Sequence, residues 1–250
     1  MDGRHRPPPP RAADPWDGLL LVDKPAGLTS HDVVDRVRRH FKLRKVGHGG
    51  TLDPMATGLL VLLLGRGTRI SARVMVADKT YEGTLHLGVT TDTDDADGRV
   101  TGRQEAGGVT REALEREMEK WRGDLQQVPP MVSAIKINGV PLYKLARKGQ
   151  IVDREPRLIH IYEMALLDFQ PPRVRFRLRC SKGTYVRTIA GDIGRDLGCG
   201  AHLEQLRRTR SGALRIEDAV ALDRLAELDL DGLVPLVIPL RTIRPEDLDR

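Results

Sequence analysis

The sequence predicts an α+β fold built on a mostly antiparallel sheet with helices packed beside it. Three observations support this fold class. Short apolar or alternating segments recur along the chain, amphipathic helical patterns separate them, and turn signals stand at hairpin spacing. Apolar residues make up 40% of the 250 residues, which is enough to fill a substantial core.

The N-terminal region begins with a stretch that lacks any hydrophobic periodicity. Residues 1–15 are rich in proline and polar side chains, so we expect a disordered tail, and residues 16–250 are expected to form the folded domain. Gly18–Asp23 reads as a short buried strand. Thr29 or Ser30 is placed to cap a helix whose apolar face carries Val33, Val34, Val37 and Phe41.

The stretch Lys45–Arg69 places a histidine, three glycines and an Asp-Pro step in a short loop, which then leads into a wholly apolar run. Its glycines allow positive φ angles and close backbone approach. Asp53 precedes Pro54 in the manner of a helix N-cap, so a capping role and a functional carboxylate are both open, and they are compatible. The longest apolar run, Leu59–Leu64, reads as a buried segment.

The middle of the chain continues with a brief helix at 70–77 and an alternating strand at 80–89. Residues 90–98 are strongly acidic, but their spacing does not match a calcium loop, and we expect an exposed loop. Arg111–Trp121 is predicted to be an amphipathic helix with Leu114, Met118 and Trp121 on its core face.

Further along, residues 128–137 are expected to be extended, Asn138-Gly139 marks a tight turn, and a short helix is expected to end at Gly149. A hairpin is predicted from 157–169 and 173–180, with apolar and arginine side chains on opposite faces of its second strand. A helix is expected after the 181–184 turn and another over Ala201–Arg210. The remaining residues predict one or two strands with a helix between them.

Composition excludes several classes of protein. No apolar run approaches the roughly 20 residues that a membrane span requires, and the N-terminus lacks the apolar core of a signal peptide, so a cytoplasmic protein is expected. Cys180 and Cys199 are too few for a disulfide framework or a zinc cage. The net charge is +6, and the acid-free basic run from Arg36 to Lys45 indicates either a polyanion partner or a solvated helix face.

The usual catalytic signatures are missing from the sequence. It has no phosphate-binding Walker loop, dinucleotide fingerprint, nucleophile elbow or paired-histidine zinc motif. A lone aspartate in a glycine-rich loop remains, and such a carboxylate can act as a nucleophile or proton carrier without a cofactor. Beside basic surfaces, its natural target is a base or sugar carbon of a nucleic acid.

A series of ordered motifs then indicates a family. The chain resembles the TruB family of tRNA pseudouridine synthases over about residues 18–215. The motifs that carry the resemblance are, in order, DKPAGLTSHDVV with GHGGTLDPMATGLL, DKTYEGTLHLGVTTDTDDADG, VPPMVSAIKINGVPLYKLARKG, CSKGTYVRTIAGDIG and LGCGAHLEQLRRTRSG. The resemblance implies a pseudouridine synthase fold with a central active-site cleft. It also implies isomerisation of the T-loop uridine of tRNA without a metal or cofactor.

The resemblance assigns roles to individual residues. Asp53 matches the catalytic aspartate, which attacks either C1′ of the ribose or the base. Arg187 matches the arginine that pairs with it, and such a pair would keep the carboxylate ionised at neutral pH. Tyr81 matches the aromatic that stacks on the flipped uracil and is a candidate to remove the C5 proton, although its position also suits an ordinary strand tyrosine.

Four further residues match binding positions of the family. His48 corresponds to the residue that enters the space left when the nucleotide flips out, and Tyr185 lines the pocket. Lys182 matches a basic support and Leu206 an apolar contact to the base, while plain structural roles suit both. Lys24 is expected to support the active-site loops without taking part in catalysis.

Bacterial members of the family commonly carry a C-terminal RNA-binding PUA domain, and we expect this chain to lack it because only a short segment follows LVPLVIPL. We therefore expect the basic faces of the catalytic domain to grip the T arm of tRNA in a monomer, with a steeper salt dependence. The lack of this domain also argues against the guide-RNA-dependent branch of the family. Two other functions remain open: an RNA-binding protein that opens and refolds tRNA elbows, and an aspartate-nucleophile hydrolase, which fits the loop but not the other motifs.

Overall fold

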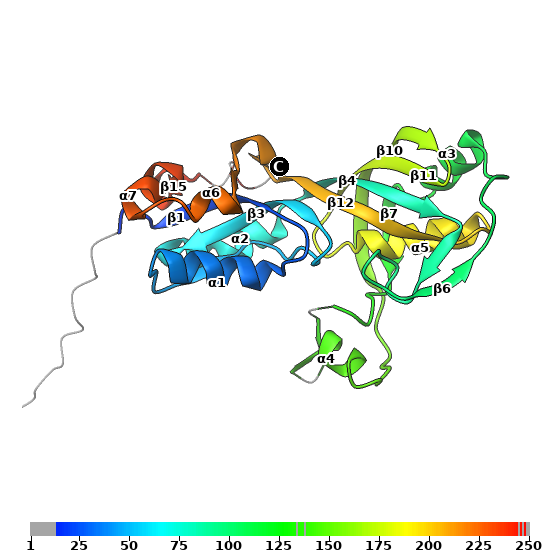
Figure 1. The fold of residues 1–250 in the computed structure, drawn as a ribbon, viewed down its shortest axis with the longest axis horizontal. Coiled ribbons are helices and arrows are strands. Elements are labelled where there is room, and N and C mark those ends of the chain that lie inside the picture. The colour runs from blue at the N-terminus through cyan, green and yellow to red at the C-terminus, as the bar shows by residue number, and fades with distance from the viewer. Residues whose placement is uncertain (1–13, 134, 138, 245, 247, 249–250) are drawn as a thin grey trace, which may run out of the picture.

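A computed structural model describes residues 14–133, 135–137, 139–244, 246 and 248, and one long sheet runs through it (Figure 1). The strand order is β14-β1-β3-β12-β4-β11-β10-β7, and all neighbours are antiparallel except β1–β14 and β3–β12. The fold is therefore α+β with a mixed, mostly antiparallel sheet, as predicted. Its strands are β1 Gly18–Lys24, β3 Thr57–Leu64, β4 Lys79–Leu87, β7 Gly123–Gln127, β10 Arg157–Gln170, β11 Arg173–Cys180, β12 Ala201–Ser211 and β14 Val220–Ala221.

Shorter strands and the helices complete the architecture. The additional strands are β2 Val46–His48, β5 Val89–Thr91, β6 Val100–Arg103, β8 Lys136–Ile137, β9 Val140–Pro141, β13 Leu214–Arg215 and β15 Val237–Pro239. The helices are α1 Ser30–His40, α2 Ser71–Val76, α3 Arg111–Glu119, α4 Leu142–Ala146, α5 Val186–Asp196, α6 Leu222–Leu225 and α7 Leu230–Leu233, and 3-10 turns include η1 Gly65–Ile70. Within the described residues, no helix is long and apolar enough to span a membrane.

The half of the sheet around β1 and β3 is covered on both faces. Leu60, Leu62 and Leu64 join the cluster that includes Val33 and Val37 of α1, whereas Leu59, Val61 and Leu63 pack with Val74 of α2. A strand buried on both faces needs an unbroken apolar sequence rather than an alternating one. This explains the run Leu59–Leu64, which the sequence predicted to be buried.

The α1 helix begins as the sequence predicted. Thr29 is the N-cap, and its side chain and that of Asp32 form a reciprocal capping box. Such a box satisfies two backbone N–H groups that a helix start otherwise leaves without partners. Val33, Val34 and Val37 are buried beneath it.

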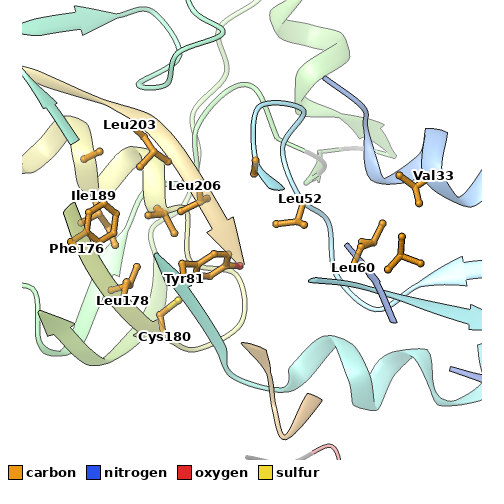
Figure 2. Packing of buried hydrophobic residues seen from close by; sticks show 14 of the residues in the cluster. Val33, Leu52, Leu60, Tyr81, Phe176, Leu178, Cys180, Ile189, Leu203 and Leu206 are labelled. Carbon is orange, nitrogen blue, oxygen red and sulfur yellow. The ribbon is translucent and has the colours of Figure 1, made fainter. Parts of the chain in front are cut away.

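The other half of the sheet packs one face on α5 and exposes the other. In β11, Val174, Phe176, Leu178 and Cys180 are buried, and the four arginines between them are exposed, as predicted. Figure 2 shows Phe176, Leu178, Ile189 and Leu203 gathered on one side and Val33 and Leu60 on the other. Leu52, Tyr81 and Leu206 lie between these two groups, so the core is continuous where the halves of the sheet meet.

The prediction of a helix over Ala201–Arg210 is wrong, because these residues form β12 between β3 and β4. Two β-bulges, at Leu203/Gln205 and at Arg208/Arg210, interrupt its alternation. A bulge inserts one extra residue, so buried positions shift from a spacing of two to a spacing of three. Leu203 and Leu206 are both buried at that spacing, which imitates the pattern of a helix.

The N-cap interpretation of Asp53 is also wrong, because no helix follows this residue. The backbone N–H of Ala56 donates to the Asp53 carbonyl at 3.1 Å, which closes a turn, and β3 begins at Thr57. The predicted tail lies outside the described residues over 1–13. The predicted turn residue Asn138 lies outside them as well, between the paired strands β8 and β9.

We expect Gly58→Ala to destabilise the protein strongly, because Gly58 is the point where β3 meets β12. Its φ is +97°, and an added Cβ would lie 2.3 Å from the Arg208 carbonyl oxygen and 2.8 Å from the Arg208 nitrogen. Backbone atoms at a strand junction cannot move aside cheaply, so the cost should be about 3 kcal/mol or more. Urea unfolding measures this change.

The matched control is Gly149→Ala, where φ is +69° and an added Cβ meets nothing within 4 Å. Only the left-handed backbone is penalised there, at about 1 kcal/mol. Equal losses of stability in the two variants would contradict the proposed clash at Gly58.

Candidate active site

A pocket of about 150 Å³ opens where the two halves of the sheet meet. Five of the residues singled out from the sequence line it: Asp53, Tyr81, Tyr185, Arg187 and Leu206. They come from the loop before β3, from β4, from the start of α5 and from β12. Thr51, Leu52, Ser133, Thr184 and Val186 complete its wall. Positions spread over more than 150 residues of sequence thus converge on one small cavity.

An ion pair forms the polar centre of the pocket. Nε of Arg187 donates to Oδ2 of Asp53 at 3.1 Å. The Arg187 side chain is 3% exposed and the Asp53 side chain 38%, so the guanidinium is enclosed while the carboxylate still faces the opening. A fixed cation behind an accessible carboxylate orients that carboxylate toward whatever enters the pocket.

Arg187 is held from three other directions. Its guanidinium donates to the Thr93 carbonyl at 3.3 Å and to the Val132 carbonyl, and Oδ2 of Asp95 lies 3.8 Å from its Nε. Asp95 is only 5% exposed. The prediction that residues 90–98 form merely an exposed loop is therefore wrong at Asp95. The loop folds back because the buried guanidinium provides a partner for its acidic side chain and its carbonyls.

The electrostatics of Asp53 are set by two opposing effects. Burial raises the pKa of Asp53 above its ordinary value, and the Arg187 guanidinium opposes this rise, while the nearby Asp95 carboxylate adds to it. The net direction is upward. The ion pair acts in the direction expected from the sequence but does not reverse the effect of burial.

Tyr81 and Leu206 form the apolar wall of the pocket on the adjacent strands β4 and β12. Tyr81 lies opposite Arg208 in the register, and Leu206 lies opposite Gly83. Both side chains are 8% exposed. Burial raises the pKa of the Tyr81 phenol, and a hydrogen bond from Arg208 opposes that rise. The ring therefore presents a flat, uncharged surface beside the carboxylate.

Tyr185 stands at the N-cap of α5, immediately before the turn that carries Arg187. The Gln127 side chain fixes its backbone, accepting from the Tyr185 N–H at 2.8 Å and donating to its carbonyl at 3.1 Å. The Arg187 guanidinium carbon lies 5.8 Å from the centre of the Tyr185 ring. This arrangement places a second aromatic ring at the pocket.

Two predicted residues do not line this pocket. His48 ends β2 at the start of the glycine-rich loop, and its Nδ1 accepts from the Gly50 N–H at 3.4 Å. Burial lowers the pKa of His48, which favours the neutral imidazole. Lys182 is exposed in the turn between β11 and α5. Both flank the site rather than complete its wall.

Lys24 supports the loop from below. Its Nζ donates to the carbonyls of Pro25, Leu28 and Pro54 at 2.8, 2.7 and 3.2 Å, and the residue is 0% exposed. Burial lowers the pKa of Lys24 to about 8. The bond to Pro54 fixes the residue next to Asp53, which is the supporting role that the sequence predicted.

Sequence reasoning missed Arg208, a 2% exposed residue. Its guanidinium donates to the carbonyls of Leu59, Thr51 and Gly50 at 2.7, 3.3 and 3.1 Å. These bonds tie β12 to the start of β3 and to the glycine-rich loop. Arg208 lies in the run Arg207–Arg210, which the sequence placed in a predicted helix over Ala201–Arg210. Its burial becomes predictable only once this segment is known to be a strand. Among the described residues, no cluster of three or more His, Cys, Asp or Glu side chains could hold a metal ion.

Comparisons with known proteins agree with this geometry. Residues 38–186 match the TruB family pseudouridylate synthase N-terminal domain, and residues 187–243 match the tRNA pseudouridylate synthase B C-terminal domain. The tRNA pseudouridine synthase B of Opitutus terrae is 51% identical over 229 residues, which cover 92% of this chain and 95% of that protein.

Two solved structures share the fold. A chain in a Cbf5-Nop10-Gar1 complex superposes with a TM-score of 0.71 at 29% identity, covering 90% of this chain and 60% of that one. A chain in an H/ACA RNP bound to a substrate RNA containing 2′-deoxyuridine gives a TM-score of 0.64 at 29% identity, with 85% and 53% coverage. This chain thus spans less than two thirds of either.

We expect Arg208→Leu to cost about 3 kcal/mol or more in unfolding free energy, because three enclosed carbonyls lose their donor at about 1 kcal/mol or more each. Arg207→Leu is the control on the same strand. Its guanidinium pairs with Asp23 at 2.7 and 3.0 Å but is 44% exposed, so its loss should cost about 1 kcal/mol or less. Denaturant titration of both variants decides the point, and similar losses would contradict the role given to Arg208.

Proposed function

The chain belongs to the TruB family of pseudouridylate synthases, which isomerise uridine in RNA to pseudouridine, and on this premise we propose that its substrate is the T-loop uridine of tRNA. The proposal rests chiefly on the pairing of Asp53 with the enclosed Arg187 at the mouth of a small pocket with aromatic and apolar walls. The curated relative with 51% identity is named a tRNA enzyme, which supports tRNA as the substrate.

Access to the pocket requires base flipping, because a carboxylate inside a protein cavity cannot reach a base within a stacked loop. The flipped uracil stacks on the Tyr81 ring and contacts Leu206. Tyr185 borders the same space. His48, at the start of the loop beside the pocket, enters the place that the nucleotide leaves, and its neutral imidazole suits stacking among bases.

The reaction exchanges one bond of the ribose for another. The N1–C1′ bond breaks with Asp53 acting either on C1′ or on the base, the uracil turns, and a C5–C1′ bond forms. The product gains a proton at N1 and loses one at C5, so atoms and charge balance without a co-reactant. The Tyr81 phenol is the candidate to take up the C5 proton; burial raises its pKa, and the Arg208 guanidinium opposes that rise and so favours the phenolate that can accept a proton.

The T-loop assignment is tested directly with unmodified tRNA. Incubation with the protein, followed by chemical or mass-resolved mapping, should find pseudouridine at one T-loop position. Modification confined to another arm would refute the assignment. Binding and refolding of tRNA with no pseudouridine at all would favour the alternative of an RNA-folding protein.

Asp53→Asn should abolish pseudouridine formation while tRNA affinity stays largely intact, because the amide keeps the shape of the side chain and loses its charge. A single-turnover rate reduced ~1000-fold corresponds to a barrier higher by about 4 kcal/mol. Asp92→Asn, in the exposed part of the acidic loop, is the control and should keep its activity. Turnover retained by Asp53→Asn would rule out the role assigned to the carboxylate.

Arg187→Gln should reduce turnover more than affinity and move the acidic limb of the pH–rate profile to higher pH. The reason is that Arg187 lowers the pKa of Asp53 against the effect of burial, so removing the guanidinium lets that pKa rise further. Measuring kcat/KM from acidic to neutral pH checks the shift. A limb that stays in place or moves to lower pH would show that Asp53 is not the group that titrates.

A further inference from the structure

A second hollow, of about 430 Å³, lies at the far end of β3 from the active site. The turn after α1, the start of β2 and the η1 turn surround it, and Trp16 forms part of its wall. Five basic side chains border it: Lys42, Arg44, Lys45, Arg66 and Arg69. We call these five residues and the space between them the basic hollow.

The charge of the basic hollow is largely uncompensated. Two carboxylates, those of Asp14 and Asp17, also border the hollow, and Nε of Arg66 lies 3.8 Å from Oδ2 of Asp17. Throughout the part of the chain that the structure describes, no carboxylate lies within ion-pair distance of Lys42, Arg44, Lys45 or Arg69. Lys42, Arg44, Lys45 and Arg69 are all exposed. A concave surface with free cations attracts anions more strongly than a flat surface with the same charges.

The arginine row of β11 provides the contrast. Arg173 pairs with Glu204 at 2.8 Å, Arg175 and Arg177 with Glu82 at 3.8 and 3.5 Å, and Arg179 with Asp78 at 3.3 Å. Carboxylates on β4, on β12 and just before β4 therefore offset the cationic face that the sequence made prominent. Of the two basic surfaces, the hollow presents the larger unpaired charge to a polyanion.

The backbone at Lys42 is a second, independent observation. Its φ is +53°, and among the described residues Asp94 is the other non-glycine residue with a positive φ. This position follows the end of α1, where glycine or asparagine is strongly preferred. A lysine in this disfavoured backbone conformation, at the border of the hollow, is expected where the positive charge of its side chain serves a function.

Two segments of the chain lead from the hollow toward the active site. β2 leads from Lys45 to His48 and pairs with the distal half of β3, Val46 with Leu64 and His48 with Leu62. On the other side, Arg69 is followed by the exposed Arg73, and Val74 packs under Gly49 of the glycine-rich loop. From Gly58 to Leu64 the strand covers about 20 Å at roughly 3.3 Å per residue.

We propose that the basic hollow binds backbone phosphates of the tRNA helix that leads away from the target loop, so that the enzyme holds its substrate at two separated places. At this distance the hollow cannot touch the flipped nucleotide. Its free cations match the regularly spaced phosphates of a duplex, which are bound without reading sequence. The proposal rests on the proposed function, since it takes tRNA as the substrate.

The test compares two triple variants that lose the same charge. Arg44→Gln/Lys45→Gln/Arg69→Gln removes three cations from the hollow, and Arg175→Gln/Arg177→Gln/Arg179→Gln removes three from the paired row of β11. The Kd for unmodified tRNA is measured at several salt concentrations, and thermal unfolding verifies that both proteins are folded. Each lost duplex phosphate contact lowers the slope of log Kd against log salt by about 0.9.

We expect the hollow variant to bind at least ~10-fold more weakly at low salt, with a slope smaller by about 2 to 3, while the β11 variant changes its slope by less than about 1. Arg44→Lys/Arg69→Lys should retain wild-type binding, because the charge is kept. Equal losses in the two triples, no loss in the hollow variant, or failure of the lysine substitutions to bind would overturn the proposal. Wild-type protein that binds tRNA through the hollow but forms no pseudouridine would refute the proposed function alone.

Discussion

The structure depends on a guanidinium buried among carbonyl groups. Arg208 joins three segments: its own strand β12, the first residues of the neighbouring strand β3, and the loop that carries the catalytic candidate Asp53. Carbonyl dipoles satisfy its N–H groups but do not neutralise its charge as a carboxylate would. Burial lowers the pKa of Lys24, His48 and Lys79, and the Arg208 charge adds to that lowering, whereas at Tyr81 it opposes the rise in pKa that burial causes. One side chain thus links the geometry of the sheet to the ionisation of the site.

Arginine serves three different purposes in this chain, and its surroundings decide which. Enclosed beside a carboxylate, Arg187 orients that carboxylate and anchors an acidic loop through Asp95. Spread along β11, arginines pair with acids across the strands and contribute solubility. In the basic hollow, Arg44 and Arg69 pair with no carboxylate of the described residues, so their charge stays available to a polyanion. Net charge alone, at +6, distinguishes none of these uses.

Sequence reasoning succeeded where local pattern and tertiary environment agree. The capping box at Thr29, the alternation of β11 and the helix after the 181–184 turn all depend on neighbours within a few residues. It failed at β12, where bulges altered the spacing of buried residues, and at Asp53, where a turn led into a strand. The five pocket residues came from the family motifs. Asp95 and Arg208 were missed because only tertiary packing shows that a charge in an acidic loop or a basic run is buried.

The strand order also has a consequence for how the chain folds. β1, near the beginning, pairs with β14 and β15, and Val22 lies opposite Val220, about 200 residues later. By contrast, the strands from β4 to β12 pair among themselves within one continuous stretch. During synthesis this middle stretch can assemble first, whereas β1 must wait for the last strands to emerge before its edge is covered. β1 can pair with β3 early, but its other edge stays uncovered for that time, and this leucine-rich edge is where a ribosome-bound chaperone would have most to protect.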